Sequence, residues 1–162
     1  MSFLPLNKKE MLERGWDTPD IVCVTGDAYV DHPSFGIAII SRVLEAAGFK
    51  ICICSQPQCD ADYMQFGRPR LAFFVSGGNI DSMVAHYTAA KRKRSNDYYT
   101  AGGKVGKRPD RATEVYCKNI RRLYGDIPLC IGGLEASLRR FAHYDYWDDR
   151  VRPVSYTHLR AH

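Results

Sequence analysis

No hydrophobic run in this sequence is long enough to cross a membrane. The apolar stretches are only a few residues long, whereas a spanning helix needs about 20. The N-terminus also lacks the long apolar segment and the small-residue cleavage site of a secretory signal peptide. We therefore expect no membrane partner, a cytoplasmic location and cysteines that stay reduced.

The six cysteines lack the spacings that hold metal ions or iron–sulfur clusters. Cys52, Cys54 and Cys59 form C-x-C-x4-C, which matches no common zinc or cluster motif. Cys23 and Cys130 lie within apolar runs, as Cys52 and Cys54 do, and the expected role of all four is that of small buried thiols. The sequence thus predicts no metal site.

Two signatures of phosphate binding are missing as well. The first predicted strand is not followed by G-x-G-x-x-G, and G-x-x-x-x-G-K-[ST] occurs nowhere in the chain. The stretch GGKVGK at 102–107 superficially resembles a phosphate-binding loop, but no predicted strand leads into it. The dinucleotide-binding and P-loop classes are therefore not expected.

What the chain does contain is the pattern of one α/β domain. It has 162 residues, 45% of them hydrophobic and 25% charged, which is enough for a core of its own. Short apolar runs rich in β-branched residues alternate with segments of helical periodicity, and this order favours an open, mainly parallel, Rossmann-like sheet. The expected strands are 21–25, 50–55, 71–76 and 127–131, and the expected helices are 35–47, 60–66, 80–87 and 111–123.

Helix-capping residues mark several of these boundaries. Asn7 and Glu10 have the spacing of a capping box before a short first helix. Ser34 and Asp110 precede the helices at 35–47 and 111–123, and each is a candidate N-cap. Gly48 stands where a helix-terminating glycine belongs.

Polar, glycine-bearing loops follow three of the predicted strands, at 26–32, 76–79 and 132–137. Ligands of open parallel sheets bind beyond the carboxyl ends of the strands, so these loops supply the candidate binding residues. The alternative is that they are only tight strand-to-helix turns. The candidates are Asp27, Asp31, His32, Asn79 and Glu135.

His32 lies close in sequence to Asp27 and Asp31. A histidine with two carboxylates can serve as an acid–base group or hold a metal ion. The interpretation that we favour is a loop stiffened by hydrogen bonds to its own backbone, with Pro33 fixing its direction.

The charge of the chain is concentrated in one segment. The net charge is +5, and residues 91–111 contain eight Lys and Arg against two Asp. A run of bases at Lys91, Arg92, Lys93 and Arg94 with tyrosines nearby suits single-stranded nucleic acid. The competing interpretation, which we favour, is a long, solvent-exposed loop. A second dense segment, 143–150, is aromatic and acidic and is typical of an interface strap.

Several ordered stretches together resemble one family. They are VTGDAYVDHPSFG at 24–36, NIDSMV at 79–84, HYT at 86–88, KRKRS at 91–95, RPDRAT at 108–113, GGLEASLRR at 132–140 and HYDYWDD at 143–149. Over about residues 2–152 the chain resembles the N-terminal domain of the YgiQ-type radical SAM proteins. The tail does not share this resemblance, so we expect a truncated domain at 1–152 and a non-native, adapter-derived tail at 153–162, with the sheet incomplete at its C-terminal side.

The resemblance implies a longer parent with a radical SAM barrel. Such a barrel binds a [4Fe–4S] cluster through C-x3-C-x2-C and cleaves S-adenosylmethionine. That motif is absent here, so no catalytic, metal or cofactor residue carries over, and we expect an inactive accessory domain whose partner is the missing C-terminal radical SAM domain. The fold should also be similar to cobalamin-binding domains, but Asp31 to Gly36 depart from their D-x-H-x-x-G. The alternative is a stand-alone α/β module that contacts RNA through 91–111.

Overall fold

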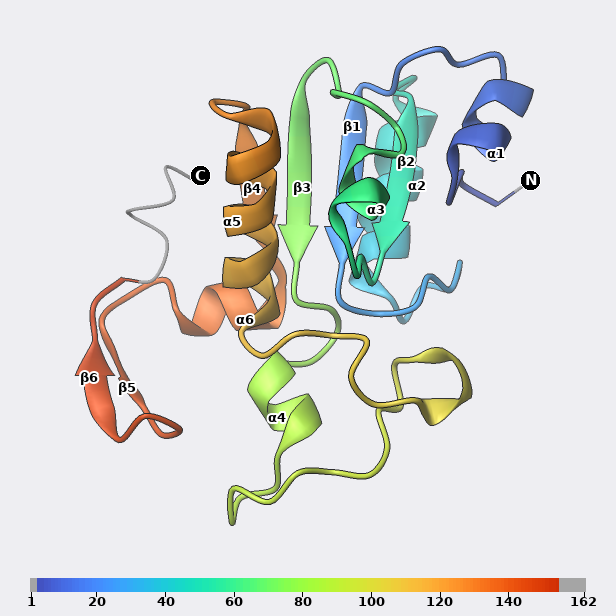
Figure 1. Ribbon diagram of the computed structural model, residues 1–162. Coiled ribbons are helices and arrows are strands. Elements are labelled where there is room, and N and C mark those ends of the chain that lie inside the picture. Colours follow the sequence, from blue (N-terminus) through green and yellow to red (C-terminus); the bar gives the residue numbers. More distant parts are fainter. Residues whose placement is uncertain (1–2, 155–162) are drawn as a thin grey trace.

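The computed structural model describes residues 3–154, so residues 155–162, most of the expected adapter-derived tail, lie outside the described residues. It confirms an α/β fold with an open, all-parallel sheet in the order β2-β1-β3-β4 (Figure 1). The strands are β1 (Ile21–Thr25), β2 (Ile51–Ser55), β3 (Ala72–Ser76) and β4 (Leu129–Gly132). The bounds of β1 are those expected from its apolar run.

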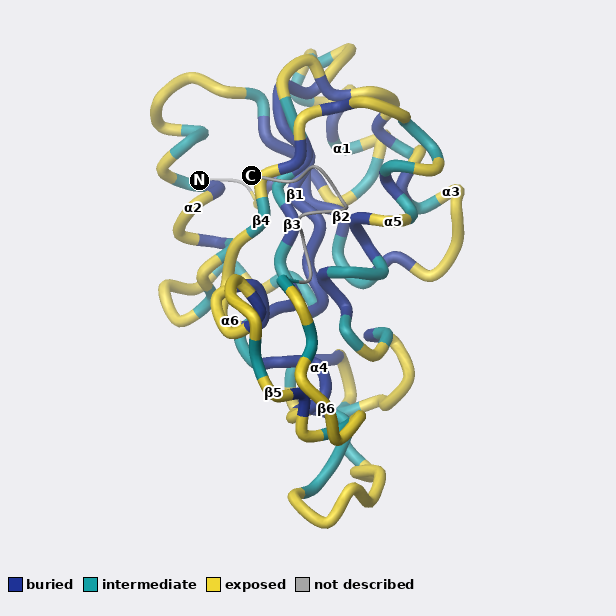
Figure 2. Tube along the Cα trace, turned by 90° about the vertical axis from the view of Figure 1, so that its left-hand side faces the viewer, coloured by how far each residue is buried: buried dark blue, intermediate teal, exposed yellow. Residues whose placement is uncertain are grey.

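Helices lie on both faces of this sheet. α2 (Gly36–Ala46) covers one face, and α3 (Asp60–Met64) and α5 (Ala112–Tyr124) cover the other, as Figure 2 shows from the side. None of the helices within residues 3–154 is both long and apolar enough to span a bilayer. The remaining elements are α1 (Lys8–Glu13), α4 (Ser82–His86), the 3-10 turn η1 (Ala101–Gly103), α6 (Gly133–Leu138), β5 (His143–Asp145) and β6 (Arg150–Arg152).

The continuous apolar character of β1 follows from its central place in the sheet. All five of its residues are buried. Val22 and Val24 point to the core under α3 and α5, whereas Ile21 and Cys23 point to the core under α2. A strand covered on both faces needs no alternation of polar and apolar residues.

Cys130 corrects one expectation about the core. Its apolar run predicted burial, but the thiol is exposed. The reason is position, because β4 is the last strand of the described sheet and α2 packs on β1 and β2. A residue on the α2 side of β4 therefore has no described helix over it.

The first helix begins and the second helix ends as the sequence indicates. The N–H of Glu10 donates to Oδ1 of Asn7 at 3.0 Å, so Asn7 is the N-cap as predicted. The return bond differs from that of a capping box, because the Glu10 carboxylate accepts the N–H of Leu6 at 2.7 Å. Gly48 follows the C-cap of α2 with a φ of +92°, which a glycine adopts without steric cost.

Two predicted N-caps are wrong. Ser34 does not cap α2, because the N–H of Gly36 instead donates to Oδ1 of Asn79 at 3.3 Å. Asp110 does not cap α5, because Arg111 occupies the N-cap position with a left-handed φ of 51°. In both places a residue distant in sequence supplies the acceptor, so a local pattern had no means of finding it.

Candidate functional site

The three strand-end loops meet at one edge of the sheet, as predicted. The N–H of Asn79, after β3, donates to Oδ2 of Asp27, after β1, at 2.7 Å. Glu135, in α6 after β4, lies against Gly77. Between β1 and β3 the strand order changes direction, and ligands of open α/β sheets bind in the crevice at such a switch point.

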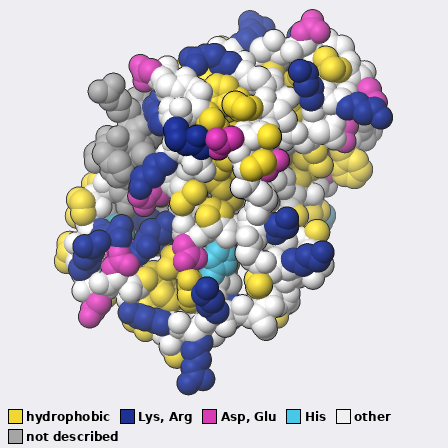
Figure 3. All heavy atoms as spheres, viewed as in Figure 1, with side chains coloured by type: hydrophobic (Ala, Val, Ile, Leu, Met, Phe, Trp, Pro, Cys, Tyr) yellow, Lys and Arg dark blue, Asp and Glu magenta, His cyan; other side chains and the backbone are white. Residues whose placement is uncertain are grey.

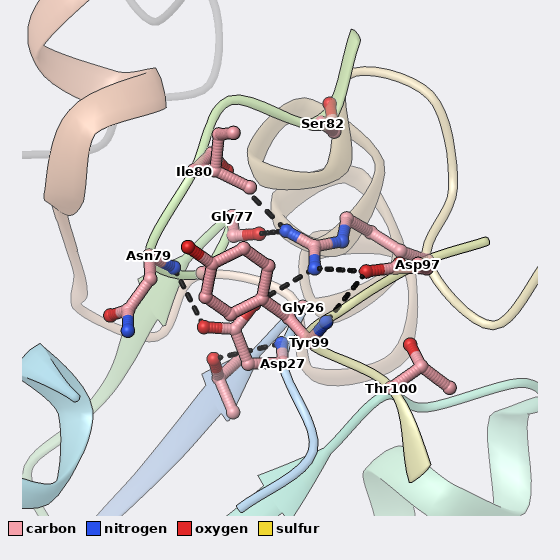
Figure 4. Close-up of polar contacts among 12 residues, drawn as sticks. Gly26, Asp27, Gly77, Asn79, Ile80, Ser82, Asp97, Tyr99 and Thr100 are labelled. Atoms are coloured by element: carbon pink, nitrogen blue, oxygen red, sulfur yellow. Dashed lines mark hydrogen bonds and ion pairs between the residues drawn. The ribbon is translucent and has the colours of Figure 1, made fainter. Parts of the chain in front are cut away.

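Arg108 occupies part of this crevice. Its side chain is fully buried, and its Nη2 lies 2.9 Å from Oδ1 of Asp27 and 3.3 Å from Oδ1 of Asp97. Its Nη1 donates to the carbonyl oxygen of Gly77 at 3.0 Å (Figure 4). The ring centroid of Tyr99 lies 5.7 Å from the guanidinium carbon. Arg108 thus takes up one part of the crevice, and a pocket lined by Asp27, Gly78 and Asn79 remains beside it.

The electrostatics of this cluster are those of a buried, shared charge. Burial raises the pKa of Asp27 above its ordinary value of 3.8, although the Arg108 guanidinium and the Asn79 N–H oppose that shift. Two carboxylates, Asp27 and Asp97, share one guanidinium, and the negative charge of Asp97 adds to the rise in the pKa of Asp27.

Two glycines bring the loops into contact. A Cβ at Gly26 would overlap the carbonyl oxygen of Gly77, and a Cβ at Gly78 would overlap Oδ1 of Asp27. Gly78 also has a φ of +107°. These glycines serve the close approach of one loop to another, which is the tight-turn alternative considered for each loop.

Asn79 and Glu135 act as caps on helix ends. The Nδ2 of Asn79 donates to the carbonyl oxygen of Ser34 at 2.9 Å, so Asn79 ties β3 to the start of α2. The carboxylate of Glu135 is buried and accepts the N–H groups of Ser82 and Thr113, each at 2.9 Å. It therefore satisfies the first turns of both α4 and α5.

Asp31 and His32 do not join Asp27. Asp31 forms an ion pair with Arg42 of α2, and this hydrogen bond lowers the pKa of the Asp31 carboxyl. His32 is exposed, and its Nδ1 accepts the N–H of Ser34 at 3.1 Å. His32 therefore stiffens its own loop, and the three residues that are close in sequence face different partners.

The basic segment is only partly the exposed loop that we expected. Asp97, Thr100 and Arg108 within it are buried, because the segment folds across the strand ends and inserts them there. Figure 3 shows Lys and Arg side chains over the whole of this face of the molecule, interspersed with Asp and Glu.

The four candidate nucleic-acid contacts divide into two pairs. Lys91 donates to the carbonyl oxygen of Trp147 at 3.3 Å, and the Nε of Arg94 donates to the carbonyl oxygens of Val84 and Tyr87. All four residues are exposed, but Lys91 and Arg94 also use their side chains for these contacts within the chain.

The aromatic and acidic segment forms the hairpin β5–β6, which straps the basic segment of the same chain. The hydroxyl of Tyr146 donates to the carbonyl oxygen of Ala89 at 2.6 Å. Arg111 pairs with Asp145 at 3.0 Å and with Asp148 at 2.9 Å. The hairpin therefore contacts both the start of α5, through Arg111, and the region of Ala89 and Lys91.

Sequence reasoning missed the residues at the centre of the crevice, namely Asp97, Tyr99 and Arg108. They are polar or aromatic residues in a segment without periodicity, which is typical of surface. The one available signal was that Arg108 belongs to the RPDRAT stretch that carries the family resemblance.

The cysteines do not fit an iron–sulfur cluster, which needs converging thiolates. Cys23, Cys52, Cys54 and Cys117 are buried, and burial raises the pKa of each to about 12. Cys59 caps α3 on one face of the sheet, and Cys130 faces the other. Across residues 3–154, no group of three or more His, Cys, Asp or Glu is placed to hold a metal ion.

Comparison with known proteins confirms the family. The model of the family described as Radical SAM N-terminal matches residues 3–160. The UPF0313 protein of Clostridium perfringens strain SM101 is 60% identical over 152 residues, which cover 93% of this chain and 23% of that protein. The UPF0313 protein of Clostridium botulinum strain 657 is 57% identical over 154 residues, which cover 94% and 24%.

The chain thus spans about a quarter of the length of these relatives. No solved structure matches it significantly. The ordered stretches that resembled YgiQ-type proteins lie inside the matched region, on the strand-end loops, the basic segment and the hairpin. The chain therefore belongs to the radical SAM N-terminal family, as found in UPF0313 proteins of the YgiQ type.

Proposed function

We propose that this chain is the non-catalytic N-terminal accessory domain of a radical SAM enzyme that depends on a [4Fe–4S] cluster and S-adenosylmethionine. The observation that carries the proposal is the match to the Radical SAM N-terminal family over residues 3–160, in a chain that spans about a quarter of its relatives' length. The pocket of about 270 Å³ beside the ion pair of Arg108 and Asp27 has mainly apolar walls, and of the six cysteines, all in the described part of the chain, Cys130 alone lines it.

The [4Fe–4S] cluster and S-adenosylmethionine then bind to a different part of the polypeptide. The relatives are about four times as long as the region they share with this chain, which leaves room for a separate catalytic barrel. The partner of this domain is that C-terminal radical SAM domain. When bound there, the cluster supplies the electron that splits S-adenosylmethionine into a radical.

A cytoplasmic location is part of the same proposal. All six cysteines are free thiols, and four of them are buried in the core. Unpaired thiols of this number are typical of a reducing compartment.

Anaerobic reconstitution with iron and sulfide tests the proposal. The full-length polypeptide should become brown and, with a low-potential reductant, release 5′-deoxyadenosine from S-adenosylmethionine. The 162-residue chain treated in parallel should do neither. A cluster-bearing, cofactor-splitting species formed by the short chain, or a full-length protein that takes up no cluster, would contradict the proposal.

RNA binding through residues 91–111 is the second candidate. The exposed bases Arg92, Lys93, Lys104 and Lys107 support it, whereas Lys91 and Arg94 are engaged within the chain. Filter binding of a single-stranded RNA over a salt series tests it, with the double variant Arg92→Ala and Lys93→Ala. Binding that neither falls with salt nor weakens in this variant would remove RNA from consideration.

A further inference from the structure

One half of one sheet face is left open among the described residues. α2 covers β1 and β2 on that face, whereas the same face of β3 and β4 has no helix of residues 3–154 over it. The result is a groove of about 270 Å³ between α2 and α6. Its walls are mainly apolar, with Ile37 and Ile40 from α2, Phe74 from β3, Cys130 from β4 and Leu134 from α6. At one end the groove reaches the strand-end loops, where Asp27 and Asn79 also line it.

The composition of the groove is that of a core surface. Phe74 is only half-buried, Cys130 is exposed, and Ile40 and Leu134 are each 49% exposed. Parallel strands are normally covered on both faces, which is why β3 and β4 carry apolar residues on this side too. Water therefore contacts a surface whose residues suit a packed interior.

The position of the groove indicates what covers it. The last described strand, β6, lies on the β4 side of the sheet (Figure 1). The relatives extend well beyond the quarter of their length that this chain spans. The continuation of the polypeptide beyond β6 is therefore long enough to reach the open groove.

We propose that this groove binds an amphipathic helix from the C-terminal continuation of the same polypeptide. Helices are the elements that cover parallel strands in α/β folds, and the groove needs aliphatic side chains opposite Ile40, Phe74 and Leu134. The inference deepens the proposed accessory function, on which it rests, because it names the surface through which this domain meets its partner.

Two exposed cysteines provide the test. Cys130 lines the groove, and Cys59 lies on the α3 side, where no cover is proposed. The full-length protein is treated with N-ethylmaleimide, and the labelling of each cysteine is followed by peptide mass spectrometry. In the folded full-length protein, Cys130 should react about tenfold or more slowly than Cys59, because labelling requires the helix to open.

A matched pair of variants strengthens the test. Ile40 lies in the groove and Met64 lies on α3, and their exposed fractions are 49% and 50%. In the full-length protein, Ile40→Glu should restore fast labelling of Cys130, since a carboxylate has no partner against an apolar helix. Met64→Glu should leave Cys130 protected.

Equal labelling of Cys130 and Cys59 in the full-length protein would overturn the inference. Protection of Cys130 in the 162-residue chain that increases with protein concentration would also overturn it, because a second copy would then occupy the groove. The labelling is independent of the cluster, so a full-length protein that shields Cys130 yet does not split S-adenosylmethionine would contradict only the proposed function.

Discussion

The guanidinium of Arg108 lies 2.9 Å from the Oδ1 of Asp27, with both side chains buried at the junction of β1 and β3. One residue comes from the basic segment and the other from the first strand-end loop. Their pairing fixes the basic segment across the carboxyl edge of the sheet. Because buried charges tolerate the loss of a partner poorly, this contact controls the stability of the edge.

Replacing the arginine tests that role. Arg108→Met leaves Asp27 and Asp97 buried without their counter-charge, and we expect a loss of about 3–5 kcal/mol in the free energy of unfolding. Urea unfolding of the chain, followed by tryptophan fluorescence, measures it. Lys104→Met, an exposed base of the same segment, should stay within about 0.5 kcal/mol of the parent. Equal effects of the two changes would argue against the pair.

Gly78 should be intolerant of any side chain. It has a φ of +107°, and an added Cβ would overlap Oδ1 of Asp27. We expect Gly78→Ala to cost about 2–4 kcal/mol, from backbone strain and displacement of the ion pair. Gly106→Ala is the control, because that glycine has a φ of +90° but open space around it, so strain alone costs about 1–2 kcal/mol. Thermal unfolding of both variants compares them, and the prediction fails if Gly106→Ala is the more damaging.

Glu135 should act through both of its oxygens. Glu135→Gln keeps the size of the side chain but replaces one carboxylate oxygen with an NH2 group. That group is a donor, and it would face the N–H of either Ser82 or Thr113, which is also a donor. We expect Glu135→Gln to lower the free energy of unfolding by about 2–3 kcal/mol. Glu13→Gln, at an exposed carboxylate of α1, should change stability by less than about 0.5 kcal/mol.

Hydrogen exchange gives a second readout for this cap. The amides of Ser82 and Thr113 should exchange faster in Glu135→Gln than in the parent, because each now lacks an ionised acceptor. Unchanged protection of both amides would contradict the capping role.

Low pH should reduce the free energy of unfolding, because it protonates surface carboxylates that form ion pairs. Hydrogen bonds from Arg42 and Arg152 lower the pKa values of Asp31 and Asp148, respectively, below the ordinary value of 3.8. A lowered pKa means that the stabilisation is present above about pH 4 and is lost as the pH falls through the folded-state pKa. Each partly exposed pair should contribute about 0.2–1 kcal/mol.

Urea midpoints between pH 6 and pH 2.5 measure this dependence. In Asp31→Asn the urea midpoint should fall less steeply as the pH is lowered. An unchanged slope would contradict a stabilising role for the Asp31–Arg42 pair. Asp27 works in the opposite sense, since its raised pKa makes stability fall as the pH rises from its unfolded to its folded pKa.

The prediction of strands from sequence depended on their local character. The bounds of β1 at Ile21–Thr25 followed from five consecutive apolar or β-branched residues, and β2 and β3 differ from expectation by one residue at their starts. The meeting of the three strand-end loops followed from the parallel direction of the strands alone. These features depend on the pattern of neighbouring residues and on the geometry common to all parallel sheets.

The contacts within the edge depended on residues far apart in the chain. Asn79 supplies the acceptor at the start of α2 that was expected from Ser34, and Glu135 supplies one for α5 that was expected from Asp110. Cys130 is exposed because of its place in the strand order, which its own apolar run does not encode.

The amino-acid sequence by itself therefore determined the α/β class, the four strands of the parallel sheet and the family, because apolar periodicity and ordered stretches are properties of the chain before it folds. Only the tertiary structure decided that Arg108 is buried against Asp27 at the strand ends and that the β3–β4 half of one face stays open. The physical reason is that burial of a charge, or exposure of an apolar face, depends on which distant segments pack against it.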